Sequence, residues 1–72
     1  MKFCNHLKDI RLQKGLTQEA LASAVGVTRQ TVIAIEREKF VPSARLALEL
    51  AAVLGAPFND IFWLETDQGE KP

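Results

Sequence analysis

The amino-acid sequence predicts an all-α protein, a compact bundle of five short helices in a chain of 72 residues. Glycine and proline divide the chain at regular intervals, at Gly15, Gly26, Pro42, Gly55 and Pro57. The segments between them carry apolar residues at spacings of three and four, the period of an amphipathic helix. Their connections are too short for the crossovers of a parallel sheet, so a helical bundle is the expected architecture.

The first two helices are expected between Asn5 and Gly15 and between Thr17 and Gly26. Asn5 and Thr17 are good N-cap residues, because their short polar side chains accept a hydrogen bond from a free backbone N–H group. Each glycine can adopt the left-handed conformation that commonly ends a helix. The apolar residues are Leu7, Ile10 and Leu12 in the first helix and Leu21, Ala22 and Val25 in the second.

The segment VTRQTVIAIEREKF, residues 27–40, is rich in β-branched residues, a composition typical of a strand. Its pattern instead favours a helix capped by Thr28. On a helical wheel, Thr28, Val32 and Ile35 form a core stripe on one side. The opposite side carries Arg29, Gln30, Ile33 and Arg37. A strand would mix these two sets and a helix separates them, so we expect a helix.

The fourth and fifth helices are expected after Ser43 and after Pro57. Ser43 is an N-cap residue, and Pro57 suits the first turn of a short helix because the N–H that proline lacks has no partner there. Apolar residues at helical spacing precede Gly55, namely Leu46, Leu50, Ala51, Val53 and Leu54.

The stretch IFWL, residues 61–64, has four large apolar residues in succession, and these cannot all face one small core. In an extended segment, Ile61 and Trp63 would point to one side, and Phe62 and Leu64 to the other. We expect a homodimer interface, formed by Phe58, Ile61, Phe62, Trp63 and Leu64. The alternative is a C-terminal segment that wraps over its own core. In either case the first residues, MKF, could lie beside it as a two-stranded β-ribbon.

The net charge is zero, but the charges are divided unevenly along the chain. Residues 1–45 hold eight Lys and Arg against four Asp and Glu, whereas residues 46–72 hold one against five. The first part therefore carries +4 and the second −4. This polarity suits a protein whose basic end meets phosphates. The alternative is a chance asymmetry in a small protein.

The start of the third expected helix carries side chains that suit a DNA groove. Arginine pairs with guanine through two acceptors, and glutamine pairs with adenine through one donor and one acceptor, so Arg29 and Gln30 could read bases. One turn further on, Ile33 could meet a thymine methyl group. Taken alone, Arg29 and Gln30 could equally be ordinary solvent-facing residues.

The preceding segment favours the DNA-reading interpretation. In TQEALASAVGVTRQTVIAIE, Ala22 allows two helices to approach closely, Gly26 takes the turn between them, and Val32 fixes the pair in the core. This pattern resembles the helix-turn-helix of the λ-Cro/repressor (Xre) family. The stretches LKDIRLQKGLTQEALA, GVTRQTVIAIE and PSARLALELAAVLG match family positions in order.

The resemblance implies a five-helix λ-repressor-like DNA-binding domain at residues 7–61, with the helix-turn-helix at about 18–37. A C-terminal extension, residues 62–72, would begin with the apolar dimer interface and end in a polar tail. In such relatives the start of the recognition helix, here Thr28 to Thr31, reads the groove. DNA-backbone contacts are implied for Gln18, Thr31, Arg37, Lys39, Ser43 and Arg45. Arg11 and Glu36 are implied to form a structural ion pair.

The sequence departs from the family pattern after the third helix. Arg37 and Glu38 stand where relatives usually have a flexible pair such as Asn-Gly, so we expect a strained or more helical exit turn. Glu38 also places a negative charge near the expected phosphates. Together with the zero net charge, this implies few phosphate contacts per subunit.

An enzyme would need a nucleophile with a base and an orienting group, or a metal cluster. The chain has one Cys and one His, and its acids are dispersed. Cys4 and His6 could supply two metal ligands per subunit, but a lone Cys and a lone His are usually packing or surface residues. We therefore expect no catalysis, no metal or cofactor, and no small-molecule ligand. A single cysteine and the absence of a long apolar run favour a cytoplasmic protein without a membrane partner.

The function expected from the sequence is that of a homodimeric transcription repressor, which binds a palindromic operator in double-stranded DNA through the third helix. The alternative is an antitoxin or adaptor of the same fold whose main role is to bind another protein. Its expected signature is a disordered or apolar tail, whereas TDQGEKP, residues 66–72, is short and polar.

Overall fold

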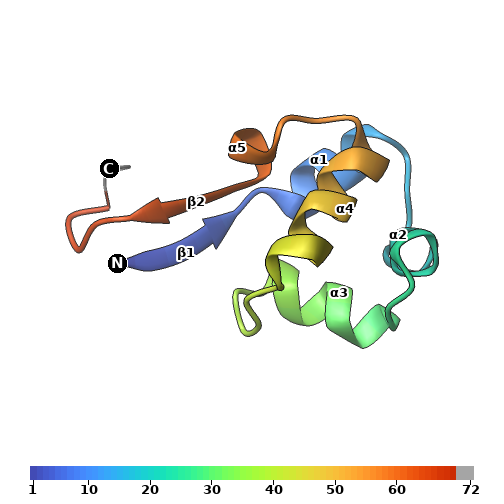
Figure 1. The fold of residues 1–72 in the computed structure, drawn as a ribbon, viewed down its shortest axis with the longest axis horizontal. Helices are drawn as coiled ribbons and strands as arrows, with labels where there is room; N and C mark the ends of the chain where they lie inside the picture. The colour runs from blue at the N-terminus through green and yellow to red at the C-terminus, as the bar shows by residue number, and fades with distance from the viewer. Residues whose placement is uncertain (70–72) are drawn as a thin grey trace.

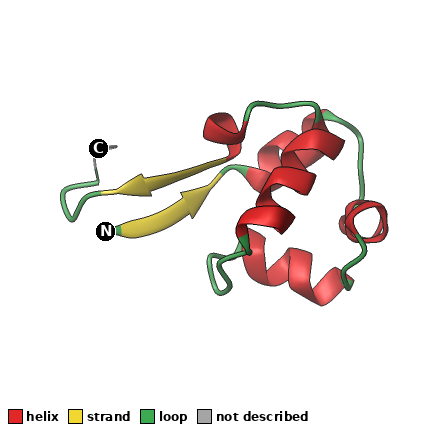
Figure 2. Cartoon of the chain, in the orientation of Figure 1, coloured by secondary structure: helices red, strands yellow, loops and turns green. Residues whose placement is uncertain are grey.

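The computed structural model describes residues 1–69 and contains five helices and two strands. The elements are β1 (Lys2–Asn5), α1 (Leu7–Gln13), α2 (Gln18–Val25), α3 (Arg29–Glu36), α4 (Ala44–Leu54), α5 (Phe58–Ile61) and β2 (Phe62–Glu65). The helices form a bundle, and the two strands project from it as a ribbon (Figure 1; Figure 2). The ribbon accounts for the elongated shape, which measures 35 × 21 × 20 Å. The predicted five-helix bundle with a short β-ribbon is confirmed.

Three of the expected N-caps are confirmed. The hydroxyl oxygens of Thr17, Thr28 and Ser43 each accept a hydrogen bond from the backbone N–H three residues later, at distances of 3.0, 3.3 and 3.1 Å. Each of these residues has an extended backbone conformation, so the chain enters α2, α3 and α4 abruptly. The starts of these helices are therefore fixed by local side-chain chemistry.

The starts of α1 and α5 differ from the prediction by one residue. Asn5 lies in β1, and α1 begins after His6, although the Asn5 side chain still accepts a hydrogen bond from the Leu7 N–H at 3.0 Å. Pro57 is the residue before α5 rather than a member of its first turn. The change at α1 follows from β1, which extends the backbone up to Asn5.

Four helices end in the same kind of turn, in which a left-handed residue lets two backbone N–H groups bind carbonyls of the last turn. After α1, α2 and α4 this residue is a glycine, namely Gly15, Gly26 and Gly55. After α3 it is Glu38, with φ of 60°, where a side chain costs about 1 kcal/mol or more. The exit turn of α3 is therefore strained, as its Arg37-Glu38 sequence predicts.

The core lies between α2, α3 and α4 and is closed by residues from both ends of the chain. Val32 and Ile35 are buried as predicted, but Thr28 is exposed. The prediction was wrong for Thr28 because its hydroxyl caps the helix from an extended position outside it. Leu12 and Val53, 56% and 41% exposed, also point outward. The buried residues are Cys4, Leu7, Arg11, Leu21, Ala22, Val25, Val32, Ile35, Pro42, Ala47, Leu50, Ala51, Leu54, Ile61 and Phe62.

The ribbon is antiparallel, and its register pairs Lys2 with Glu65 at one end and Asn5 with Phe62 at the other. Ile61 ends α5 and is not extended, so side-chain alternation begins at Phe62. Ile61 and Phe62 are 0% and 1% exposed in the single chain. The prediction that they form a dimer interface is thus corrected, because both side chains pack into the core of their own chain.

Candidate nucleic-acid interface

The candidate interface is built from α2, the turn at Gly26, and α3. The α2 helix packs against both α3 and α4. Because Val32 and Ile35 face the core, the opposite side of α3 must face solvent. Figure 1 shows α3 along the lower side of the bundle, with its first turn next to α2 and its last turn below the ribbon.

The side chains that the sequence predicts to read bases lie at or near the first turn of α3. Thr28, Arg29 and Gln30 are exposed, and Ile33 is half-buried one turn further along. Thr31 is half-buried, and its hydroxyl lies 3.2 Å from that of Thr28. The structure therefore brings together a cation, an amide and an apolar group at one end of an outward-facing helix.

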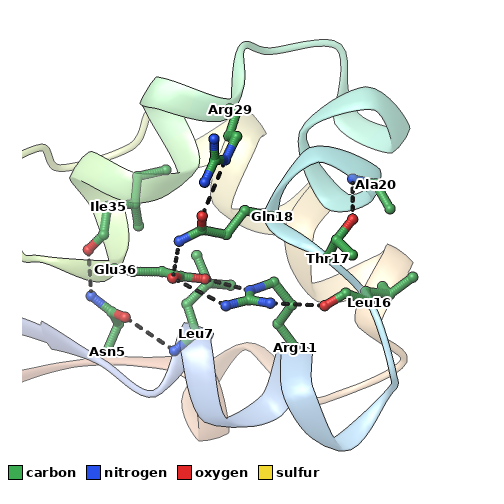
Figure 3. A network of polar contacts seen from close by, with 10 residues as sticks. All are labelled: Asn5, Leu7, Arg11, Leu16, Thr17, Gln18, Ala20, Arg29, Ile35 and Glu36. Carbon is green, nitrogen blue, oxygen red and sulfur yellow. Dashed lines mark hydrogen bonds and ion pairs between the residues drawn. The ribbon is translucent and has the colours of Figure 1, made fainter.

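A chain of polar contacts connects this end of α3 to the interior (Figure 3). Arg11 Nε lies 2.7 Å from Glu36 Oε2, and these two side chains are only 7% and 4% exposed. Arg11 Nη1 also donates to the Leu16 carbonyl at 2.8 Å. The structure thus contains the ion pair that the family resemblance implies.

Gln18 links this buried pair to the surface. Its Nε2 donates to Glu36 Oε1 at 3.1 Å, and its Oε1 accepts from Arg29 Nε at 3.3 Å. Figure 3 shows Gln18 between the two charged side chains. Sequence reasoning missed this bridge, since it expected Gln18 to contact DNA. The partners are 18 and 11 residues away, and no local pattern marks them.

A second group of basic side chains lies at the opposite end of α3. Arg37 and Lys39 are exposed on the loop that leaves the helix, and Ser43 and Arg45 are exposed at the start of α4. An eight-residue helix is about 12 Å long, so the two ends of α3 are separated by roughly that distance. The start of α4 also offers backbone N–H groups and the positive end of a helix dipole, which favour anions.

Two carboxylates near these basic groups are paired. Arg45 Nε lies 3.3 Å from Glu49 Oε1, one turn away on α4. Lys2 Nζ on β1 lies 3.1 Å from Glu38 Oε1, and this hydrogen bond raises the pKa of the Lys2 amino group. The negative charge of Glu38, expected to face phosphates, is thus partly compensated by the N-terminal strand.

An aromatic row runs along one side of the ribbon and α5. The Phe58 and Phe62 rings, and the Phe62 and Phe3 rings, each have centroids 5.5 Å apart. Phe58 and Leu64 remain 36% and 44% exposed, and Trp63 is half-buried against the His6 ring. Of the five residues expected in a dimer interface, these three keep accessible surface.

The described residues also show where Cys4, one of the two candidate metal ligands, lies. Cys4 is buried on β1, and this burial raises the pKa of its thiol. Residues 1–69 contain no group of three or more side chains that could hold a metal ion. Within the same residues, no helix has both the length and the apolarity needed to cross a bilayer.

The geometry defines the class of the protein. Two packed helices joined by a left-handed glycine, with a polar and exposed start to the second helix, form a helix-turn-helix within a five-helix bundle. The helix-turn-helix family model HTH_3 matches residues 7–61. The chain therefore belongs to this family of transcriptional regulators, of the Xre type.

Two curated relatives are similar over nearly their whole length. The chain is 46% identical over 63 residues to the uncharacterized HTH-type transcriptional regulator YgzD of Bacillus subtilis, covering 88% of this chain and 96% of YgzD. It is 48% identical over 64 residues to MJ0272 of Methanocaldococcus jannaschii, covering 89% and 97%. It is also 29% identical over 59 residues to the cryptic phage CTXphi transcriptional repressor RstR of Vibrio cholerae, covering 82% and 53%.

A solved structure with the same fold is the restriction-modification controller protein C.AhdI from Aeromonas hydrophila. Its TM-score is 0.71 at 35% identity, and the match covers 75% of this chain and 78% of C.AhdI. The ribbon strands lie outside residues 7–61, which the family model matches.

Proposed function

We propose that this protein is a homodimeric, sequence-specific transcription repressor that binds a palindromic operator through α3 in the major groove. The observation that carries the proposal is the first turn of α3, where Arg29 and Gln30 are exposed on a helix whose opposite side is buried. A helix of this kind fits the major groove, with its N-terminal residues against the base edges.

The side chains at this end of α3 can each contact a particular group on a DNA base. Arg29 would donate two hydrogen bonds to a guanine, and Gln30 would donate to and accept from an adenine. Ile33 would contact a thymine methyl group, and Thr28 lies at the edge of the same surface. Each good bidentate pair discriminates against a wrong base by about 1–3 kcal/mol.

Gln18 supports base reading by holding Arg29. A free arginine side chain loses rotamer entropy when it binds, and a side chain already held by a neighbour loses less. The contact from Gln18 uses Arg29 Nε and leaves the two terminal nitrogens of the guanidinium for a guanine. Gln18 itself is anchored by Glu36. Gln18 is thus proposed to orient Arg29, in addition to any phosphate contact of its own.

Phosphate contacts are proposed for the groups that flank α3. Thr31 lies beside the reading residues, whereas Arg37, Lys39, Ser43 and Arg45 lie at the far end of the helix. Contacts at both ends would fix the register of α3 along the groove. Because two nearby cations, Lys2 and Arg45, are paired with carboxylates, we expect a shallow dependence of affinity on salt.

The homodimer is proposed to form through the side chains of α5 and β2 that keep accessible surface, with Phe58, Trp63 and Leu64 against a second copy. Two-fold symmetry would then present two α3 helices to half-sites about 34 Å apart. Repression would follow from occupying promoter DNA. The relative RstR, named a transcriptional repressor, supports this role.

The proposal can be tested by nuclear magnetic resonance with a 15N-labelled protein and a mixed-sequence duplex at low salt. Amide shifts should change at the starts of α2, α3 and α4, where backbone N–H groups and cations face outward. Changes confined to the aromatic row, or no changes at all, would contradict DNA binding. In the first case the alternative of a protein-binding adaptor would gain support.

A further inference from the structure

The strained exit turn of α3 is braced by the N-terminal strand. In the other three turns of this type glycine takes the left-handed position, whereas Glu38 takes it after α3. A larger side chain would have room at these three positions, since a Cβ at Gly15, Gly26 or Gly55 would meet no atom within 4 Å. The difference is one of backbone conformation, which L-residues rarely adopt. An exit turn with Glu38 needs support that the glycine turns do not.

Two side chains of β1 reach this turn. Lys2 pairs with the Glu38 carboxylate at 3.1 Å, but its side chain is 66% exposed, and exposed pairs contribute little. Asn5 makes the stronger contact, because its Nδ2 donates to the Ile35 carbonyl at 2.9 Å in a partly buried position. The same carbonyl accepts the Glu38 N–H at 3.0 Å, which closes the strained turn.

The other end of the Asn5 amide fixes the side chain in place. Its Oδ1 accepts the Leu7 N–H at 3.0 Å, at the start of α1 (Figure 3). One carboxamide therefore ties the last turn of α3 to the first turn of α1. Both ends of the amide meet a complementary partner. A carboxamide carries its donor and its acceptor on separate atoms, which neither a hydroxyl nor a carboxylate does.

We propose that Asn5 is a positioning residue for the recognition helix. The first turn of α3 is held by Gln18 through Arg29. Its last turn is held at the Glu36 side chain by Arg11 and Gln18, and at the Ile35 backbone carbonyl by Asn5. The bonds to Glu36 act on a side chain, whereas the bond from Asn5 acts on the backbone of the last turn. Without it, this backbone can shift at the far end of a helix about 12 Å long. Base reading depends on distance and direction more steeply than phosphate attraction does, so specificity should fall more than general affinity. This inference rests on the proposed DNA-reading function of α3.

The substitution Asn5→Asp separates the two contacts. A carboxylate still accepts the Leu7 N–H and suits the start of α1, but it cannot donate to the Ile35 carbonyl. Asn59→Asp is the matched control, since it adds the same charge at an exposed site on α5. Both variants are also made in a Glu38→Gly background, whose relaxed exit turn provides a reserve of stability.

The affinities of each protein are measured for a duplex that the wild type selects from a random pool and for a scrambled duplex of equal composition. Asn5→Asp should reduce the selected-to-scrambled ratio by about fivefold, the equivalent of one hydrogen bond. Hydrogen exchange should also become faster in the last turn of α3 but not in α1. A purely structural role would lower stability without changing the ratio.

The outcomes separate the two proposals. If the wild type shows a preference and Asn5→Asp retains it at the level of Asn59→Asp, the positioning role of Asn5 is wrong and the DNA-reading proposal stands. If the wild type itself shows no preference, the proposed function is wrong, and the role in base reading is wrong with it. In that case hydrogen exchange in the last turn of α3 still tests whether Asn5 holds this helix. If the exchange rate is the same in Asn5→Asp and in the wild type, that structural role is wrong as well.

Discussion

Removing only one partner of the buried pair of Arg11 and Glu36 should greatly lower the free energy of unfolding. Both side chains are less than a tenth exposed and are 2.7 Å apart. In Glu36→Leu the guanidinium stays buried without its carboxylate, which typically costs about 3–5 kcal/mol. A chain of this length is expected to have a total stability of about 4–11 kcal/mol. Glu36→Leu should therefore remove between about a quarter and all of the stability.

The double variant gives a sharper expectation. Arg11→Met with Glu36→Leu removes both charges and fills the same space with apolar groups, which is often nearly neutral. What remains is the loss of partners for the Leu16 carbonyl and for Gln18 Nε2, at about 1 kcal/mol each. We expect the double variant to be about 1–3 kcal/mol less stable than the wild type, well below the sum of the two single losses.

The assay is urea denaturation followed by circular dichroism at a fixed protein concentration, because a dimer would make stability depend on concentration. The control is the exposed pair of Arg45 and Glu49, whose side chains are 89% and 44% exposed. The same substitutions there should change stability by less than about 0.5 kcal/mol. The reasoning is refuted if Glu36→Leu costs no more than Glu49→Leu, or if the two single losses at Arg11 and Glu36 simply add.

Three further predictions concern the DNA-reading surface, the exit turn and the dimer. Arg29→Ala should cost about 1–3 kcal/mol at one base position when single-base variants of a selected duplex are compared; an equal loss on every duplex would show that Arg29 touches only phosphate. Glu38→Gly should raise the free energy of unfolding by about 0.5–1 kcal/mol, since it removes the left-handed strain; Glu38→Ala keeps the strain, and an equal gain there would contradict this cause. Leu64→Asp should weaken self-association in analytical ultracentrifugation, whereas Leu48→Asp, exposed on α4, should not; equal behaviour of the two would place the interface elsewhere.

Local chemistry made much of the fold predictable. Thr17, Thr28 and Ser43 mark the starts of three helices because capping needs only a residue and its neighbour three positions on. Left-handed glycines mark the ends of α1, α2 and α4 for a similar reason. Periodicity alone could not say which apolar residues face inward, so Leu12 and Val53 proved exposed while Ala47 is buried. Periodicity also missed that the helix ends at Ile61 and a strand begins at Phe62, which directs the Phe62 side chain into the core.

The candidate site was predictable in its residue types but not in its connections. Arg29, Gln30 and Ile33 were selected from their position at the start of a helix. The contacts of Gln18 with Glu36 and of Asn5 with Ile35 join residues 18 and 30 positions apart. Such contacts depend on how α1, α2 and α3 pack together, which no short stretch of sequence contains. The strain at Glu38 was foreseeable because a glutamate stands where a flexible pair is usual.

The most direct test of the central claim is selection of bound duplexes from a random DNA pool, repeated at about 50 mM and about 200 mM salt. A regulator that reads bases through two symmetric α3 helices should enrich one site with two-fold symmetry, with half-sites about one helical turn apart, at both salt concentrations. Binding without any enriched sequence, abolished at the higher salt, would show that the basic surface attracts only phosphates. That result would contradict sequence-specific regulation by this protein.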